Sequence, residues 1–213
     1  DQNGATMSGA SLTWATSAAS VATVSSTGLV TSVADGSATV TATSGELSDT
    51  VAVTVLQTAT SIELSDTVLT FPSLGDTATL SATVKDAAGS IVAGASVTWA
   101  TSAEGVATVS DGGLVTAVTN GTATVTASSG SLEATAAVTV AQEVSSIELS
   151  DTVLAFASLA DTTQLTATVK DANDRTISGA TVTWSTSAAS VATVSSAGLV
   201  TSVSDGTATI TAT

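Results

Sequence analysis

Residues 97–128 read VTWATSAEGVATVSDGGLVTAVTNGTATVTAS, and close variants of this stretch occur three times in the chain. Three tryptophans mark the copies at one constant interval, and three glycines keep the same interval. These residues are Trp14, Trp99, Trp184, Gly28, Gly113 and Gly198. The chain is therefore a tandem array of one 85-residue repeat.

Alternation of apolar and polar residues within the stretch indicates β-strands. In residues 97–99 the pattern turns Val97 and Trp99 to one face of a strand, and in residues 122–127 it turns Ala123, Val125 and Ala127 inward while the threonines meet water. Seven or so such short strands in each repeat, separated by turn signals, predict a sandwich of two antiparallel sheets.

The connection Thr119-Asn120-Gly121 joins the run 114–118 to the run 122–127. Asn-Gly and Asp-Gly are strong hairpin signals because both residues tolerate positive φ. We therefore expect the two runs to pair as a hairpin, and we expect the same at Asp35-Gly36 and Asp205-Gly206.

The composition supports an all-β fold and excludes several functions. Val, Thr, Ala and Ser dominate a chain with only 2% aromatic residues, and no helical apolar periodicity is visible. Three basic residues against 18 acidic ones give a net charge of −15, which excludes a basic patch for nucleic acid or anionic lipid. No apolar run approaches the length that a membrane helix needs, and no leader is visible, so we expect any signal peptide to lie outside this sequence.

Phase along the 85-residue repeat predicts three domains. Residues 1–56 form the C-terminal part of a repeat and open with a polar turn at residues 1–4, residues 57–141 form one complete repeat, and residues 142–213 form a repeat that lacks its last strand. The incomplete first and third domains would expose apolar strand edges. We therefore expect them to be completed from outside residues 1–213, by continuation of the chain or by strand addition between neighbouring copies in a filament.

The order of motifs resembles one known family. SIEL at 61–64, LSATVKDAAG at 80–89, VTWATSAEGVATVS at 97–110, GLVTAV at 113–118 and NGTATVTA at 120–127 resemble the bacterial immunoglobulin-like group 2 domain. Members of that family are stacked in extracellular adhesins of the intimin and invasin type, in surface-layer-associated and phage proteins, and beside glycan-degrading enzymes. The resemblance implies an immunoglobulin-like sandwich in an extracellular, spacing or adhesive role, and it implies no catalytic residue.

Catalysis has few candidate residues in this sequence. His, Cys and Tyr are absent, which removes the usual general bases, nucleophiles and imidazole ligands. A Ser–Lys pair is conceivable, but Lys85 and Lys170 occupy one phase of the repeat and are typical of solvated strand ends. We expect no enzyme activity.

Calcium is the more serious candidate ligand, because carboxylates recur at fixed phase and hard cations bind oxygen. The alternative for each is a polar β-turn or a solvated strand edge that discourages pairing. The recurring set also includes Asp1, Asp76, Asp86 and Asp161, and the candidate calcium ligands are Glu63, Asp66, Glu148, Asp151, Asp171 and Asp174.

The tryptophans allow two interpretations. One tryptophan per domain in an inward strand phase is typical of the core of an immunoglobulin-like sandwich, and the alternative is an exposed platform that stacks on carbohydrate.

The function that the sequence favours is a non-catalytic stalk or filament segment that spaces or presents an adhesive tip at the cell surface. The alternatives are a module that binds a glycan or a host protein, and a spacer within a large surface enzyme.

Overall fold

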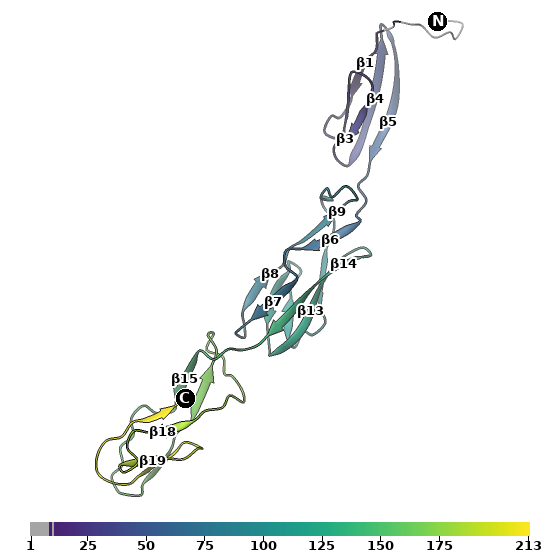
Figure 1. Cartoon of the computed structure of the whole chain (residues 1–213). Coiled ribbons are helices and arrows are strands. Elements are labelled where there is room, and N and C mark those ends of the chain that lie inside the picture. Colours follow the sequence, from purple (N-terminus) through teal and green to yellow (C-terminus); the bar gives the residue numbers. More distant parts are fainter. Residues whose placement is uncertain (1–8, 10) are drawn as a thin grey trace. The chain divides into compact units, whose positions relative to one another are not determined.

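The computed structural model of the chain describes residue 9 and residues 11–213, and every regular element in this part is a β-strand. Figure 1 shows these strands along the chain. The chain divides into two compact units, Asp1–Ser61 with Val84–Ala95 and Ile62–Thr83 with Ser96–Thr213. The polar turn expected at residues 1–4 lies outside the described residues. The all-β fold class is confirmed.

The first unit contains two small antiparallel sheets. One has the strand order β1-β4-β5 and the other pairs β2 with β3. Ala22, Ala38 and Val40 are buried in this unit. The strands are β1 (Thr13–Thr16), β2 (Ala22–Val24), β3 (Val30–Ser32), β4 (Gly36–Ser44) and β5 (Leu47–Val55).

In the second unit, the second repeat is a two-layer sandwich. One sheet has the order β10-β13-β14-β7 and the other the order β11-β12-β8. Both sheets contribute to one apolar core that includes Phe71, Leu80, Val115, Val125 and Val138. The strands are β7 (Val68–Phe71), β8 (Thr77–Thr79), β10 (Thr98–Thr101), β11 (Ala107–Val109), β12 (Leu114–Ala117), β13 (Gly121–Ser129) and β14 (Leu132–Val140).

One pair in this sandwich is parallel, where the sequence predicted only antiparallel sheets. β14 runs parallel to β7, with Ala137 opposite Val68 and Val140 opposite Phe71. The opening segment of the repeat pairs first as β6 (Ser61–Leu64) with β9 (Ala82–Lys85), and then as β7 with β14. Alternation within a strand reports its buried face but not the direction of its partner, so the pattern could not reveal this switch.

The third repeat has three small sheets. They have the orders β15-β17, β16-β20-β19 and β18-β21. Leu165, Ala192 and Val200 form its buried core, with Trp184 and Ile210 half-buried against it. The strands are β15 (Ser146–Leu149), β16 (Thr162–Gln164), β17 (Ala167–Lys170), β18 (Trp184–Thr186), β19 (Ala192–Val194), β20 (Leu199–Ser202) and β21 (Ile210–Ala212).

The inward phase predicted for residues 122–127 is confirmed. Ala123 is 7% exposed, while Val125 and Ala127 are fully buried, and Thr122 and Thr124 between them are exposed. Small side chains suffice here because the facing sheet supplies Leu80 and Val115 to the same core. A core of Val and Ala therefore closes without many aromatic residues.

The hairpin predicted at Asn120-Gly121 is wrong. β12 pairs with β11 and β8, whereas β13 pairs with β10 and β14, so the connection crosses from one sheet to the other. The β13–β14 hairpin turns instead at Gly130, which has a φ of 60°. Gly121 is needed for another reason, because it has a φ of 148° and an added Cβ would lie 3.0 Å from Val106 Cγ2.

Each tryptophan packs against the glycine that shares its interval. A Cβ built on Gly113 would lie 3.0 Å from Trp99 Cζ2 and 2.2 Å from the carbonyl oxygen of Leu80, and Gly198 repeats this arrangement with Trp184 and Leu165. The ring of Trp99 packs against the core cluster but stays half-buried. The shared periodicity of tryptophans and glycines thus reflects direct contact between them.

Candidate functional site: a hydrogen-bonded joint between repeats

The six candidate calcium ligands do not converge. Glu63, Asp66, Asp151 and Asp174 are exposed. Within residue 9 and residues 11–213, no group of three or more acidic side chains is arranged to hold a metal ion. Calcium binding by these residues stays a prediction.

Glu148 has a cation as its neighbour. Lys170 Nζ donates a hydrogen bond to Glu148 Oε2 within the β15–β17 sheet. This bond lowers the pKa of Glu148 and raises the pKa of Lys170. Glu148 is exposed and Lys170 is half-buried, so solvent screens the pair and its contribution to stability is small.

Asp171 differs from the other candidates because it is almost completely buried, with 1% of its surface exposed. It follows β17 directly and begins a turn in which its Oδ1 accepts hydrogen bonds from the backbone N–H groups of Asn173 (3.0 Å) and Arg175 (2.9 Å). Such a turn closed by an aspartate oxygen is the expected use of this residue type. Asp174 in the same turn has a φ of 58°, as the turn requires.

The second oxygen of Asp171 reaches the preceding repeat. Oδ2 accepts hydrogen bonds from the backbone N–H of Leu74 at 2.9 Å and from Gln142 Nε2 at 2.8 Å. Leu74 lies in the turn after β7, and Gln142 lies between β14 and β15. One carboxylate therefore connects a turn of the second repeat, the linker and a turn of the third repeat.

Neighbouring amides extend this joint on both sides. Asn173 Nδ2 donates to the carbonyl oxygen of Leu74 at 3.1 Å and to Asp76 Oδ1 at 2.7 Å. The backbone N–H of Gln142 donates to Asn120 Oδ1 at 2.9 Å, and Asn120 Nδ2 donates to Gln142 Oε1 at 3.1 Å. Asn120, which sequence reasoning assigned to a hairpin, thus anchors the linker.

The first unit repeats part of this arrangement one repeat earlier. The backbone N–H of Gln57 donates to Asp35 Oδ1 at 2.6 Å, and Gln57 Nε2 donates to Asp86 Oδ2 at 3.1 Å. Asp86 Oδ1 accepts from the backbone N–H groups of Ala88 and Ser90. Asp1, the remaining aspartate of this phase, lies outside the described residues.

Hydrogen bonding keeps both aspartates ionised. Burial of Asp171 acts to raise its pKa, but the bonds from Gln142, Leu74, Arg175 and Asn173 outweigh burial and lower the pKa of Asp171 from 3.8 to about 2. The bonds from Gln57 and Ser90 likewise lower the pKa of Asp86. These N–H donors stabilise the buried charge of Asp171 in the way that a cation would.

Sequence reasoning missed the glutamines of this joint. Gln57 and Gln142 occupy the same phase of the repeat, and each precedes its aspartate by 29 residues. The recurrence of a glutamine in both linkers, at a fixed spacing from a recurring aspartate, was the available signal. Among the described residues, no helix is long and apolar enough to cross a membrane.

Comparison with known proteins identifies the domain type. The sequence profile of the bacterial Ig-like domain (group 2) matches residues 2–55, 58–140 and 143–213. No curated protein sequence matches the chain.

Three solved structures illustrate the likeness. Domains 4 and 5 of the S-layer protein SbsC are 27% identical, with coverage of 66% of this chain and 78% of that chain and a TM-score of 0.39. The Escherichia coli adhesin FdeC is 19% identical (86% and 71%, TM-score 0.43), and invasin, a bacterial integrin-binding protein, is 23% identical (86% and 43%, TM-score 0.46). The chain spans 30% of a longer SbsC structure.

Proposed function

This chain belongs to the bacterial Ig-like domain (group 2) family, and on that premise we propose that it is a non-catalytic structural segment of an extracellular or cell-surface protein. In this proposal its repeats form a stalk or filament that spaces or presents an adhesive tip. Its partners are the neighbouring repeats and copies of the same protein.

The observation that carries the proposal is the joint at Asp171. A spacer must resist bending where one domain meets the next, and a short linker alone limits but does not remove that freedom. Here the linker residue Gln142 is bonded to the second repeat through Asn120 and to the third through Asp171. The bond between Gln57 and Asp86 matches the bond between Gln142 and Asp171. This recurrence supports the proposal that the joint is a feature of the repeat, as an array of many domains requires.

The chemistry of the joint also supports a structural role. A general acid or base works best with a pKa near the operating pH, whereas Asp171 has a pKa of about 2. Its two oxygens accept four N–H donors from the protein itself. The net charge of −15 favours solubility and disfavours lateral association of long arrays.

A distance measurement across the joint tests the proposal. The chain has no cysteine, so Thr135→Cys and Thr193→Cys, both at exposed strand positions on either side of the joint, can carry spin labels. Double electron–electron resonance on the full chain should give a narrow distance distribution. Asp171→Ala should broaden it, and the control Asp151→Ala, at an exposed aspartate outside the joint, should not.

A broad distribution in the unmutated chain, or one that Asp171→Ala leaves unchanged, would contradict a stiffening role for the joint. The circular dichroism spectrum of each variant shows whether its strands are still formed. A loss of strand structure in Asp171→Ala would be separated from loosening by the gentler variant Asp171→Asn, which keeps the shape of the side chain but not its charge.

A further inference from the structure

Two strands of the second repeat that are far apart in sequence lie side by side and run in the same direction. β7 is the first strand of the two sandwich sheets along the chain and β14 is the last, and they pair in parallel over four residues. The backbone N–H of Ala137 also donates to the carbonyl oxygen of Thr67 at 2.8 Å. The chain reaches this pair at the start of β7 and leaves it at the end of β14. Tension along the chain therefore slides the two strands past each other and loads their evenly spaced hydrogen bonds together.

The linker extends this parallel ladder beyond the last residue of β14. The backbone N–H of Ala141 donates to the carbonyl oxygen of Phe71 at 3.0 Å, and that of Glu143 donates to the carbonyl oxygen of Pro72 at 2.8 Å. A later linker bond goes to the third repeat, where the N–H of Ser145 donates to the carbonyl oxygen of the last residue of β17 at 2.8 Å. When the chain is pulled, the linker therefore moves with the third repeat.

Asp171 connects the third repeat to the chain just beyond β7. Its Oδ2 accepts a hydrogen bond from the backbone N–H of Leu74, which lies in the turn that follows β7. Asn173, from the same turn as Asp171, donates to the carbonyl oxygen of Leu74 and to Asp76 Oδ1. Tension pulls Leu74 toward the start of β7 and pulls Asp171 the opposite way with the linker. β7 can therefore slide along β14 only if these bonds break as well.

We propose that Asp171 is a mechanical lock by which the third repeat prevents β7 from sliding out of the second repeat under tension. The inference rests on the proposed function, in which the chain connects an adhesive tip to a surface and is pulled along its length. Without Asp171, only the ladder between β7, β14 and the linker resists sliding. With it, sliding must also break a charge-assisted hydrogen bond, which is roughly twice as strong as a neutral one. The resistance of one repeat to load thus depends on a side chain of the next.

Optical tweezers at constant load, applied to the full chain, test the lock in two pulling directions. The chain has no cysteine, so Asp66→Cys and Val144→Cys, both at exposed positions, can attach handles immediately before β7 and shortly after β14. This pair makes β7 slide along β14. A second pair, Asp66→Cys and Ser131→Cys, attaches both handles at the end where the parallel strands begin, so the same load peels β7 from its first residue. Neither pair places the third repeat between the handles.

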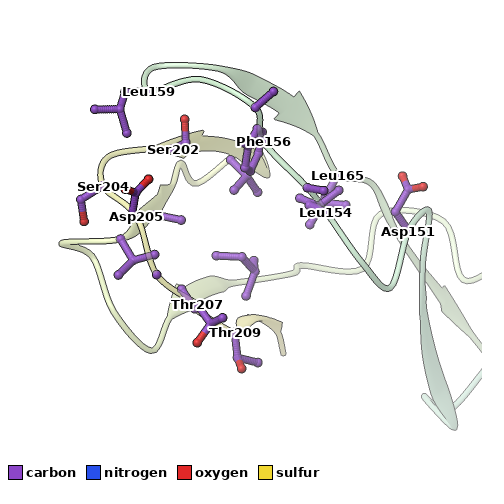
Figure 2. Close-up of a pocket in the computed structure, with 18 of the residues that line it drawn as sticks. Asp151, Leu154, Phe156, Leu159, Leu165, Ser202, Ser204, Asp205, Thr207 and Thr209 are labelled. Carbon is purple, nitrogen blue, oxygen red and sulfur yellow. The ribbon is translucent and has the colours of Figure 1, made fainter.

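Asp171→Ala should raise the unfolding rate under sliding load by about tenfold, the loss expected for one charge-assisted hydrogen bond that breaks in the rate-limiting step. Under peeling load it should change the rate by less than about twofold, because the bond at Leu74 is still intact when β7 begins to open at its other end. Asp151 provides the control, because it lines a pocket of the third repeat and lies outside the joint (Figure 2). Asp151→Ala should change neither rate.

Two results would overturn the lock. Equal acceleration in both directions would show that Asp171→Ala only destabilises the second repeat, and an unchanged rate under sliding load would show that the joint bears no load. Asp171→Asn, which keeps the shape of the side chain, should also accelerate sliding more than peeling. An unchanged sliding rate with a narrow spin-label distance distribution would remove the lock alone, whereas a broad distribution in the unmutated chain would contradict the proposed stalk.

Discussion

Ala160 and Asp174 are the non-glycine residues with positive φ in the part of the chain that the structure describes, and alanine tolerates this conformation less well than aspartate. Ala160 has a φ of 61° in the turn before β16, and in the second repeat Gly75 takes the same place with a φ of 85°. A left-handed conformation costs an L-residue roughly 1–2 kcal/mol relative to glycine, and a Cβ added at Gly75 would meet no atom within 4 Å. The cost at this position is therefore in the backbone and not in packing.

Reciprocal substitutions test this interpretation. Ala160→Gly should raise the free energy of unfolding of the third repeat by about 1 kcal/mol, and Gly75→Ala should lower that of the second repeat by a similar amount. Denaturant unfolding of the full chain, followed by amide signals assigned to each repeat, measures both. Changes of the same sign in the two variants would contradict the account.

At the scale of elements, the contact between Trp99 and Gly113 connects the two sheets of the sandwich. Trp99 lies on β10, and Gly113 immediately precedes β12 of the opposite sheet. Trp99→Ala should cost the second repeat about 3 kcal/mol, because the small neighbours of the ring cannot fill the cavity. Thermal unfolding measures the loss, and a cost below about 1 kcal/mol would contradict a core role for the ring and favour the alternative of an exposed platform.

Alternation in the sequence predicts which face of a strand is buried, but it does not predict which strand is its partner. The inward phase of Ala123 and Val125 depends only on local alternation, so it could be predicted. The partner of each strand depends on contacts far away in the chain, which is why Asn120-Gly121 was assigned to a hairpin although it crosses between sheets. Asp171 was recognised as a recurring carboxylate, but its role depends on Gln142 and Leu74, which only the fold brings to it.

At the scale of the whole molecule, the joint gives stability a defined dependence on pH. The folded-state pKa of Asp171 is about 2, below its ordinary value of 3.8, so its contribution is fully present above about pH 4 and is lost as pH falls toward 2. The difference in melting temperature between the unmutated chain and Asp171→Asn should therefore be constant near neutral pH and should shrink below pH 4. A difference that grows on acidification would contradict the assignment.

The most direct test of the joint is hydrogen exchange at the backbone amide of Leu74. This amide belongs to the second repeat, but its acceptor is Asp171 of the third, so its protection reports the bond between repeats and little else. We predict that the amide is protected in the full chain both with and without a calcium chelator, and that Asp171→Ala abolishes its protection while leaving the amides of β13 protected. Exchange of Leu74 at the rate of an unprotected amide, or protection that disappears on chelation, would contradict a joint held by hydrogen bonds alone.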